Sequence, residues 1–121
     1  MRGIVLFAHG ARDPEWARPF ERIRDRVRSS RPECPIELAY LEVMAPTLEE
    51  AIASLAGEGA SSITVFPLFM AQGGHLKHDL PKILDAIRQT HPNLPLSLET
   101  AIGEVPEILE AISAWILERV D

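Results

Sequence analysis

The sequence predicts an α/β protein, a three-layer sandwich in which a four-stranded parallel sheet carries helices on both faces. Short apolar segments alternate with helical segments four times along the 121 residues. Such alternation with short connections is typical of a parallel sheet with right-handed crossovers. The first apolar segment also lacks polar alternation, which indicates a strand buried on both faces. No repeat or linker marks a second domain, so we expect residues 1–121 to form a single domain.

The first strand and helix follow from residues 3–30. The apolar segment ends abruptly at His9, and Gly10 follows at once. Asp13 before Pro14 is typical of a helix N-cap with proline at the first helical position. Pro19 then either bends this helix or marks its later true start. The predicted apolar face of the helix has spacings of four, three and four residues and consists of Trp16, Phe20, Ile23 and Val27.

The remaining elements are predicted from residue 36 onward. Strands are expected at 36–41, 62–66 and 96–102. Thr47 and Glu50 have the spacing of a capping box and begin the second helix. The third helix is expected to begin at residues 79–81, and the last one opens at residues 103–106. The apolar positions of the last helix are Ile108, Ile112, Trp115, Ile116 and Val120.

Composition excludes several classes of function. The net charge of −6 and the pI of about 5.2 argue against a nucleic-acid partner. No apolar run approaches the ~20 residues that span a bilayer, and the N-terminus does not resemble a signal peptide. The only cysteine is Cys34, so no disulfide can form within the chain and we expect a cytoplasmic location.

Three ionisable residues follow three successive predicted strands. His9 follows the first strand, Glu42 the second and His75 the third. The carboxyl ends of parallel strands lie at the same rim of a sheet, where open α/β sheets bind ligands. Two imidazoles and a carboxylate suit a divalent first-row metal ion and can also accept protons near neutral pH.

Two of these residues, His9 and Glu42, also have a purely structural interpretation. His9, taken alone, can also be interpreted as a hydrogen-bonded structural residue at a strand end. Glu42 can also be interpreted as a cap of the helix that begins near Thr47. His78 is open to interpretation as a surface residue at the start of a helix. Other common chemistries have no motif: there is no dinucleotide-binding or Walker glycine pattern, no G-x-S-x-G and no zinc-finger spacing.

Four motifs together resemble one family. They are the segments 9–14 (HGARDP), 41–48 (LEVMAPTL), 65–69 (VFPLF) and 74–81 (GHLKHDLP). In order and spacing they are similar to the small CbiX-type chelatases, which insert cobalt, or in relatives iron or nickel, into sirohydrochlorin. Ala11 stands where the family commonly has serine. The histidine-rich segment and the second fused half of some relatives are not present in this chain.

The resemblance implies roles for particular residues. His9 and His75 match the catalytic, metal-binding histidines of the family, and Glu42 matches a third participant. The substrate is a tetrapyrrole, and the divalent metal ion (Co, Fe or Ni) is a second substrate, so no tightly bound cofactor is expected. Arg12 and Lys77 are candidates for pairing with the peripheral carboxylates of the ring. Gly74 would allow the backbone to approach a flat ligand closely.

Two further expectations complete the interpretation. A non-catalytic tetrapyrrole or metal carrier and a flavodoxin-like interaction module remain as alternatives to an enzyme. We also expect a homodimer, because a chain of this size offers only one wall to a large flat ligand. Its interface should use apolar residues of the last helix or of the 68–76 loop. Trp115 is a candidate for that interface, although we expect it to be buried in the core.

Overall fold

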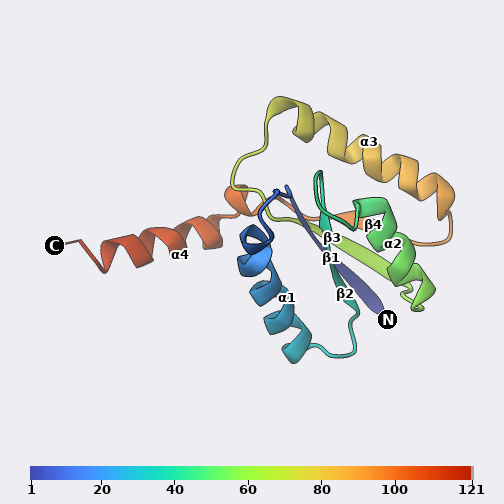
Figure 1. The fold of residues 1–121 in the computed structure, drawn as a ribbon, viewed down its shortest axis with the longest axis horizontal. Coiled ribbons are helices and arrows are strands. Elements are labelled where there is room, and N and C mark those ends of the chain that lie inside the picture. The colour runs from blue at the N-terminus through green and yellow to red at the C-terminus, as the bar shows by residue number, and fades with distance from the viewer. Residues whose placement is uncertain (121) are drawn as a thin grey trace.

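The structure, a computed structural model, describes residues 1–120 apart from the side chain of His75. Four parallel strands form one sheet: β1 (Arg2–Ala8), β2 (Ile36–Tyr40), β3 (Ser62–Pro67) and β4 (Leu96–Leu98). Their order across the sheet is β2-β1-β3-β4, so β1 and β3 are the inner strands (Figure 1). None of the helices in the described chain is both long enough and apolar enough to span a membrane.

Helices cover both faces of the sheet, which confirms the predicted fold class. The side chains of β1 alternate between two cores: Val5 and Phe7 lie in one, Leu6 and Ala8 in the other. The first core is closed by α2 (Leu48–Gly57) and α3 (Gly74–Thr90). The second is closed by the short 3₁₀ helix η1 (Pro14–Ala17) and by α1 (Arg18–Ser30).

The helices begin at the capping residues and prolines that the sequence predicts. Asp13 caps η1, because its side chain accepts a hydrogen bond from the backbone N–H of Glu15 at 2.9 Å. Pro19 lies in the first turn of α1, so it marks a later start rather than a bend. Thr47 and Glu50 form the predicted capping box of α2, with bonds of 2.8 and 3.2 Å.

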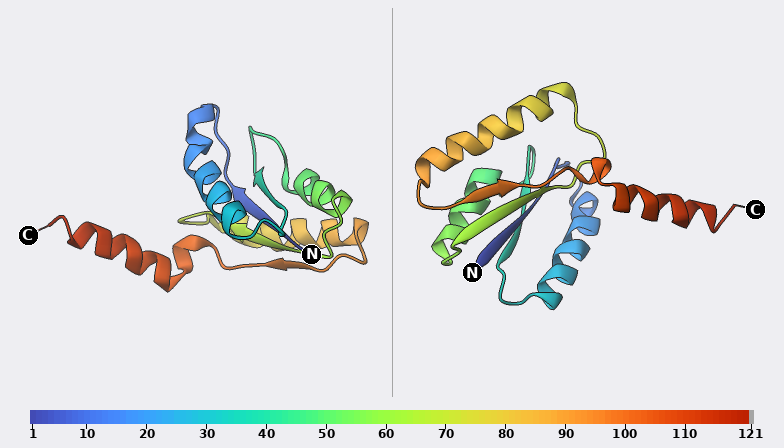
Figure 2. Two further views of the ribbon diagram at one scale, coloured as in Figure 1. Left: turned by 90° about the horizontal axis from the view of Figure 1, so that it is seen from below. Right: turned by 180° about the vertical axis from the view of Figure 1, so that it is seen from behind.

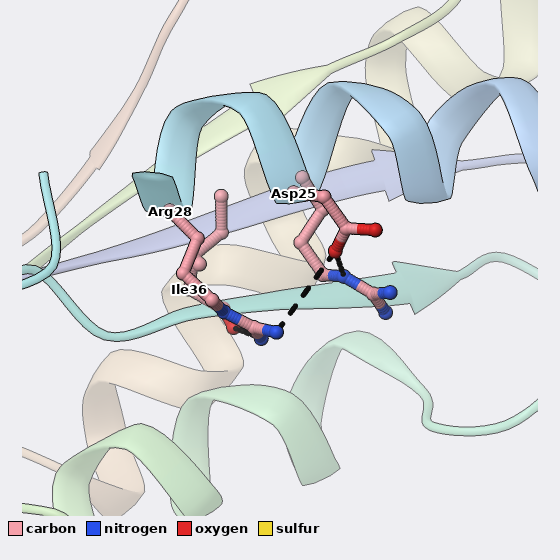
Figure 3. Close-up of polar contacts among 4 residues, drawn as sticks. Asp25, Arg28 and Ile36 are labelled. Atoms are coloured by element: carbon pink, nitrogen blue, oxygen red, sulfur yellow. Dashed lines mark hydrogen bonds and ion pairs between the residues drawn. The ribbon is translucent and has the colours of Figure 1, made fainter. Parts of the chain in front are cut away.

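The end of α1 is tied to the start of β2 by polar contacts (Figure 3). Nη2 of Arg28 donates to the carbonyl oxygen of Ile36 at 3.4 Å. Nη1 of the same arginine lies 4.0 Å from a carboxylate oxygen of Asp25, which also accepts a hydrogen bond of 3.0 Å from Arg24. These contacts set where the chain enters the edge strand.

Two predicted boundaries are wrong. Helix α3 begins at Gly74 rather than near residue 79, because Leu76 already packs against the core one turn before the buried Leu80. Strand β4 ends at Leu98 instead of residue 102, since β3 supplies only three paired positions. Helix α4 (Pro106–Leu117), which follows the 3₁₀ turn η2 (Ile102–Glu104), has no buried residue.

Helix α4 extends away from the sheet instead of packing on it. Both other views agree that it projects from the body near the end of β4 (Figure 2). The expectation that Trp115 is buried in the core of its own chain is therefore wrong: the residue is 58% exposed. Helices α2 and α3 cover one face of the sheet, and α1 covers part of the other.

Candidate functional site

His9 lies directly after β1, at the carboxyl end of an inner strand. Its imidazole is about half exposed and packs edge-on against the ring of Phe69, with ring centroids 5.5 Å apart and an interplanar angle of 88°. Phe69 is itself 4% exposed and meets Phe7 in a second edge-on contact of 5.6 Å. The core therefore positions the imidazole of His9 from one side, while the ring as a whole remains about half exposed to solvent.

Glu42 lies beside His9 because backbone pairing continues past the ends of the strands. The N–H of Leu41 donates to the carbonyl of Ala8 at 2.9 Å, and the N–H of Glu42 donates to the carbonyl of His9 at 3.0 Å. The side chains follow: Nε2 of His9 lies 4.0 Å from Oε1 of Glu42. The predicted convergence of these two residues is confirmed.

The alternative role of Glu42 as a helix cap is not needed. Thr47 is the N-cap of α2, and Glu50 supplies the reciprocal carboxylate. The side chain of Glu42 is 63% exposed, and its Oε1 lies near the imidazole of His9. Glu42 is therefore available for a role other than capping α2.

Gly10 allows the two segments to approach this closely. Its φ of +98° lies in the region that favours glycine, and a Cβ added there would lie 1.9 Å from the carbonyl oxygen of Glu42. No side chain fits at that distance. The sequence shows a glycine directly after His9, but it does not show that the backbone of Glu42 approaches this glycine.

Val43, next to Glu42, has a strained backbone. Its φ is +70°, and its side chain is 66% exposed. A β-branched residue in this region costs roughly 1–3 kcal/mol, and such strain is found most often at functional sites. Nothing in the sequence indicates this conformation, because valine is not typical of left-handed positions.

His75 and its neighbours begin α3 instead of lying in a loop. The backbone of His75 is in the first turn, after the N-cap Gly73. Its side chain lies outside the described part of the structure, so the predicted convergence with His9 stays a prediction. A Cβ on Gly74 would meet nothing within 4 Å, so this glycine leaves open space at the surface. His78 is exposed.

Two cations predicted for substrate carboxylates lie at the same end of the sheet. Arg12 is exposed in the turn between β1 and η1. Lys77 is exposed on the first turn of α3 and lines a 260 Å³ cavity with Met70, Gln72 and Glu104, among others. In the 68–76 segment, Phe69 belongs to the core, while Met70 is 55% exposed.

The side chains of His9 and Glu42 are candidate ligands for a single metal ion. Ligand bonds from imidazole and carboxylate to such ions are about 2 Å long, so two donors on one ion are at most about 4 Å apart. The observed 4.0 Å between Nε2 and Oε1 lies at this limit, so a bent arrangement around one ion requires the two side chains to move closer. The described side chains, which do not include that of His75, contain no cluster of three or more His, Cys, Asp or Glu residues that could hold a metal ion.

The fold and this pair define a class: an α/β protein with a candidate divalent-metal site at the carboxyl rim of a parallel sheet. Comparison with known proteins then gives the family. The sequence profile of the CbiX family matches residues 3–119, and the chain belongs to the CbiX family.

Individual relatives agree with this assignment. A sirohydrochlorin cobaltochelatase of Saccharolobus islandicus is 38% identical over 123 residues, which cover 100% of this chain and 94% of the relative. One from Methanopyrus kandleri is 36% identical over 84 residues, or 69% of this chain and 59% of the relative.

Solved structures share the fold. A cobalamin biosynthesis CbiX protein from Marinobacter aquaeolei has a TM-score of 0.84 and 31% identity, covering 99% of this chain and 98% of that one. SirB from Bacillus subtilis with Fe3+ has a TM-score of 0.80 at 22% identity; the match covers 99% of this chain and 48% of SirB. At that identity the likeness to SirB concerns the fold alone.

Proposed function

We propose that this protein is a sirohydrochlorin chelatase that inserts a divalent metal ion, with cobalt the metal we favour, in tetrapyrrole (cobalamin or siroheme) biosynthesis. The observation that carries the proposal is the His9–Glu42 pair at the rim, 4.0 Å apart, in a chain of the CbiX family. Relatives that are 38% identical over the whole chain have the same activity in their names.

The protein must assist the reaction in two ways. A divalent ion must be held and stripped of water, and two pyrrole N–H protons must leave as the metal enters the ring. A neutral imidazole of His9 can bind the ion or accept a proton, but one nitrogen cannot do both at once. Glu42 supplies a second acceptor beside it, and His75 a third from the first turn of α3. Because His9 and Glu42 are exposed, the protons can pass to water.

Substrate binding is assigned to the groups around this pair. Sirohydrochlorin carries many carboxylates, so Arg12 and Lys77 would bind its periphery by charge-assisted hydrogen bonds. Gly74, with open space around its Cα, would let the start of α3 approach the flat ring. The metal is a substrate here, and cobalt, iron and nickel share the same preferred ligand types.

The test is an anaerobic insertion assay with sirohydrochlorin and Co²⁺, Fe²⁺ or Ni²⁺ in parallel, followed by the absorbance of the ring. We expect many turnovers per protein, fastest with Co²⁺, and a loss of roughly 10²-fold or more in the variant His75→Ala. A rate equal to spontaneous insertion would contradict the proposal. Stoichiometric binding without turnover would assign the protein to the carrier alternative.

The setting of the reaction is part of the proposal. We propose that residues 1–121 act as a single domain, in the cytoplasm, as a homodimer. The single cysteine supports a reducing compartment. The exposed apolar side chains of α4 support association of two copies, since large exposed apolar patches mark interaction sites.

A further inference from the structure

Two large apolar side chains are exposed at the rim that carries the candidate metal site. Val43 is 66% exposed and Met70 is 55% exposed. Between residues 2 and 105 of the described structure, Ile23 on α1 is the only other large apolar side chain that is exposed. Burial stabilises an apolar side chain and exposure does not. Two of these three exposed side chains therefore lie where a ligand of the site would cover them.

Val43 and Met70 lie on opposite sides of His9. Val43 directly follows Glu42, and Met70 directly follows Phe69, whose ring packs against the imidazole of His9. The segments after β1, β2 and β3 lie at the same end of the sheet (Figure 1), and β1 is the strand between the other two. Since neighbouring strands are about 4.8 Å apart, the ends of β2 and β3 flank His9 at a separation of roughly 10 Å. This span is on the scale of a four-pyrrole ring.

The backbone around Val43 is fixed in a strained turn. The N–H of Met44 donates to the carbonyl of Glu42 at 2.7 Å, and Val43 between them has a φ of +70°. A hydrogen bond between residues i and i+2 with positive φ at the centre defines the rare, strained form of the γ-turn. The N–H of Tyr40 donates to the carbonyl of Pro46 at 2.9 Å and closes the loop around it. Glycine or asparagine would adopt this turn at lower cost, so the fold alone does not explain a valine here.

The backbone of Met70 is also held in place. The N–H of Gly103 donates to the carbonyl of Phe69 at 3.0 Å, and a Cβ added to Gly103 would overlap the carbonyl oxygen of Met70. The side chain of Met70 contributes to the wall of the 260 Å³ cavity that Lys77 also lines. A methionine side chain is flexible and polarizable, so it adapts to the surface of an apolar ligand.

The chemistry of metal insertion decides which surface of the ring these side chains meet. The ion enters a tetrapyrrole from one face, so His9 and Glu42 must approach that face in order to deliver it. Side chains on either side of His9 then contact the same face, which is apolar, while the carboxylates of sirohydrochlorin lie at the periphery. An apolar pair with the exposed cations Arg12 and Lys77 at the same end of the sheet is complementary to such a ligand.

We propose that Val43 and Met70 bind one face of the tetrapyrrole ring, on either side of His9, and set its distance from the His9–Glu42 pair. The inference rests on the proposed function and deepens it, because it names the residues that recognise the apolar face of the substrate. Neither side chain carries a group that accepts a pyrrole proton at neutral pH. Their loss should therefore weaken binding of the ring and raise its KM, with little change in kcat.

Substitution of Val43 separates ring binding from backbone strain. Val43→Asn relieves the turn and removes the apolar surface, whereas Val43→Ile keeps both the strain and the surface. In titrations with metal-free sirohydrochlorin, followed by the absorbance of the ring, we expect the Kd of Val43→Asn to rise at least about tenfold and that of Val43→Ile to stay within about twofold. Val120→Asn makes the same change at a valine that is 63% exposed beyond the end of α4, and should leave the Kd unchanged.

Substitution of Met70 tests the other side of the ring. Met70→Gln keeps the length of the side chain but makes it polar, and should raise the Kd at least about fivefold, whereas Met70→Leu should stay within about twofold. The two sites are separate, so Val43→Asn and Met70→Gln together should raise the Kd by about the product of the single effects. The increase should persist at high ionic strength, which screens charge pairs but not apolar contact. In the insertion assay the KM for sirohydrochlorin should rise in parallel, while the KM for Co²⁺ stays at the wild-type value.

The outcomes separate the ring contact from the proposed function. A wild-type chain that inserts metal, with Val43→Asn and Met70→Gln variants that bind the ring equally well, overturns the ring contact and keeps the function. Slower kcat without weaker binding, or an equal loss of binding in Val120→Asn, also overturns it. A wild-type chain that neither binds sirohydrochlorin nor inserts metal overturns both proposals.

Discussion

Nε2 of His9 and Oε1 of Glu42 lie 4.0 Å apart, and the same two residues are joined by a backbone hydrogen bond of 3.0 Å. The side-chain pair is therefore held by the pairing of β1 with β2 rather than by a flexible loop. Sites that stand on rigid elements keep their geometry without a ligand.

Replacing His9 by alanine should lower metal insertion by roughly 10²-fold or more, the usual effect of losing a positioned acid or base. Stability should change little, because the side chain is about half exposed. The matched control is His91→Ala, at the far end of α3, which should keep the wild-type rate. Insertion kinetics and thermal unfolding of both variants provide the check; equal rates in both would remove His9 from the site.

Replacing Glu42 by glutamine should reduce insertion less than the loss of His9. The amide keeps the size of the side chain but loses the charge that binds a cation and accepts a proton. Weaker binding of Co²⁺, measured by titration calorimetry, should accompany the slower rate. Glu49→Gln, an exposed carboxylate on α2, is the control. Unchanged cobalt affinity in Glu42→Gln would exclude this carboxylate as a ligand.

Replacing Gly10 by alanine should destabilise the fold by at least about 2 kcal/mol, because alanine disfavours positive φ and its Cβ would overlap the carbonyl of Glu42. Gly57→Ala is the matched control. It ends α2, its Cβ would meet nothing within 4 Å, and alanine there should stabilise by up to about 1 kcal/mol. Urea unfolding of both variants measures the difference, and a Gly10 variant as stable as wild type would refute the close approach.

Replacing Phe69 by leucine should slow insertion while costing less than about 1.5 kcal/mol of stability, since the core keeps most of its volume. The reason is loss of the edge-on contact that positions the imidazole of His9. Phe20→Leu, in α1, makes the same change beside Trp16, in the core on the other face of the sheet from Phe69. A comparison of kcat with the unfolding midpoint separates the two variants. If kcat falls equally in both, Phe69 has no positioning role.

Replacing Val43 by asparagine should stabilise the protein by about 1 kcal/mol, because asparagine tolerates the left-handed region. The exposed valine side chain contributes little burial in return. Chemical denaturation gives the stability, and the insertion assay shows whether the strain serves Glu42. A loss of stability would mean that the side chain of Val43 makes contacts that outweigh the backbone cost.

Local patterns, together with the rule that parallel strands end at the same rim of a sheet, could be predicted from the sequence. The alternation of β and α segments gave the parallel sheet, and the positions of His9 and Glu42 after successive strands gave their convergence. Cap residues such as Asp13 and Thr47 act within one turn, so their spacing alone identifies them.

Features that depend on distant packing could not be predicted in this way. The apolar pattern of α4 has the same periodicity whether the helix covers its own sheet or that of another molecule, so Trp115 was open to two interpretations. The start of α3 is decided by the packing of Leu76 against a core built from other segments. The role of Phe69 depends on a contact with His9 across 60 positions of sequence.

The central place of β1 in the sheet has a consequence for how the chain folds. β1 pairs with β3 from Arg2 opposite Ser62 to Phe7 opposite Pro67, and the amino terminus donates to Oγ of Ser61 at 2.8 Å. During synthesis on a ribosome, the first strand to emerge therefore keeps one edge unpaired until more than half of the chain has been made. Contacts between segments this distant slow folding, and an unpaired apolar edge is open to association with other nascent chains. We expect closure of the β1–β3 pair to limit the folding rate.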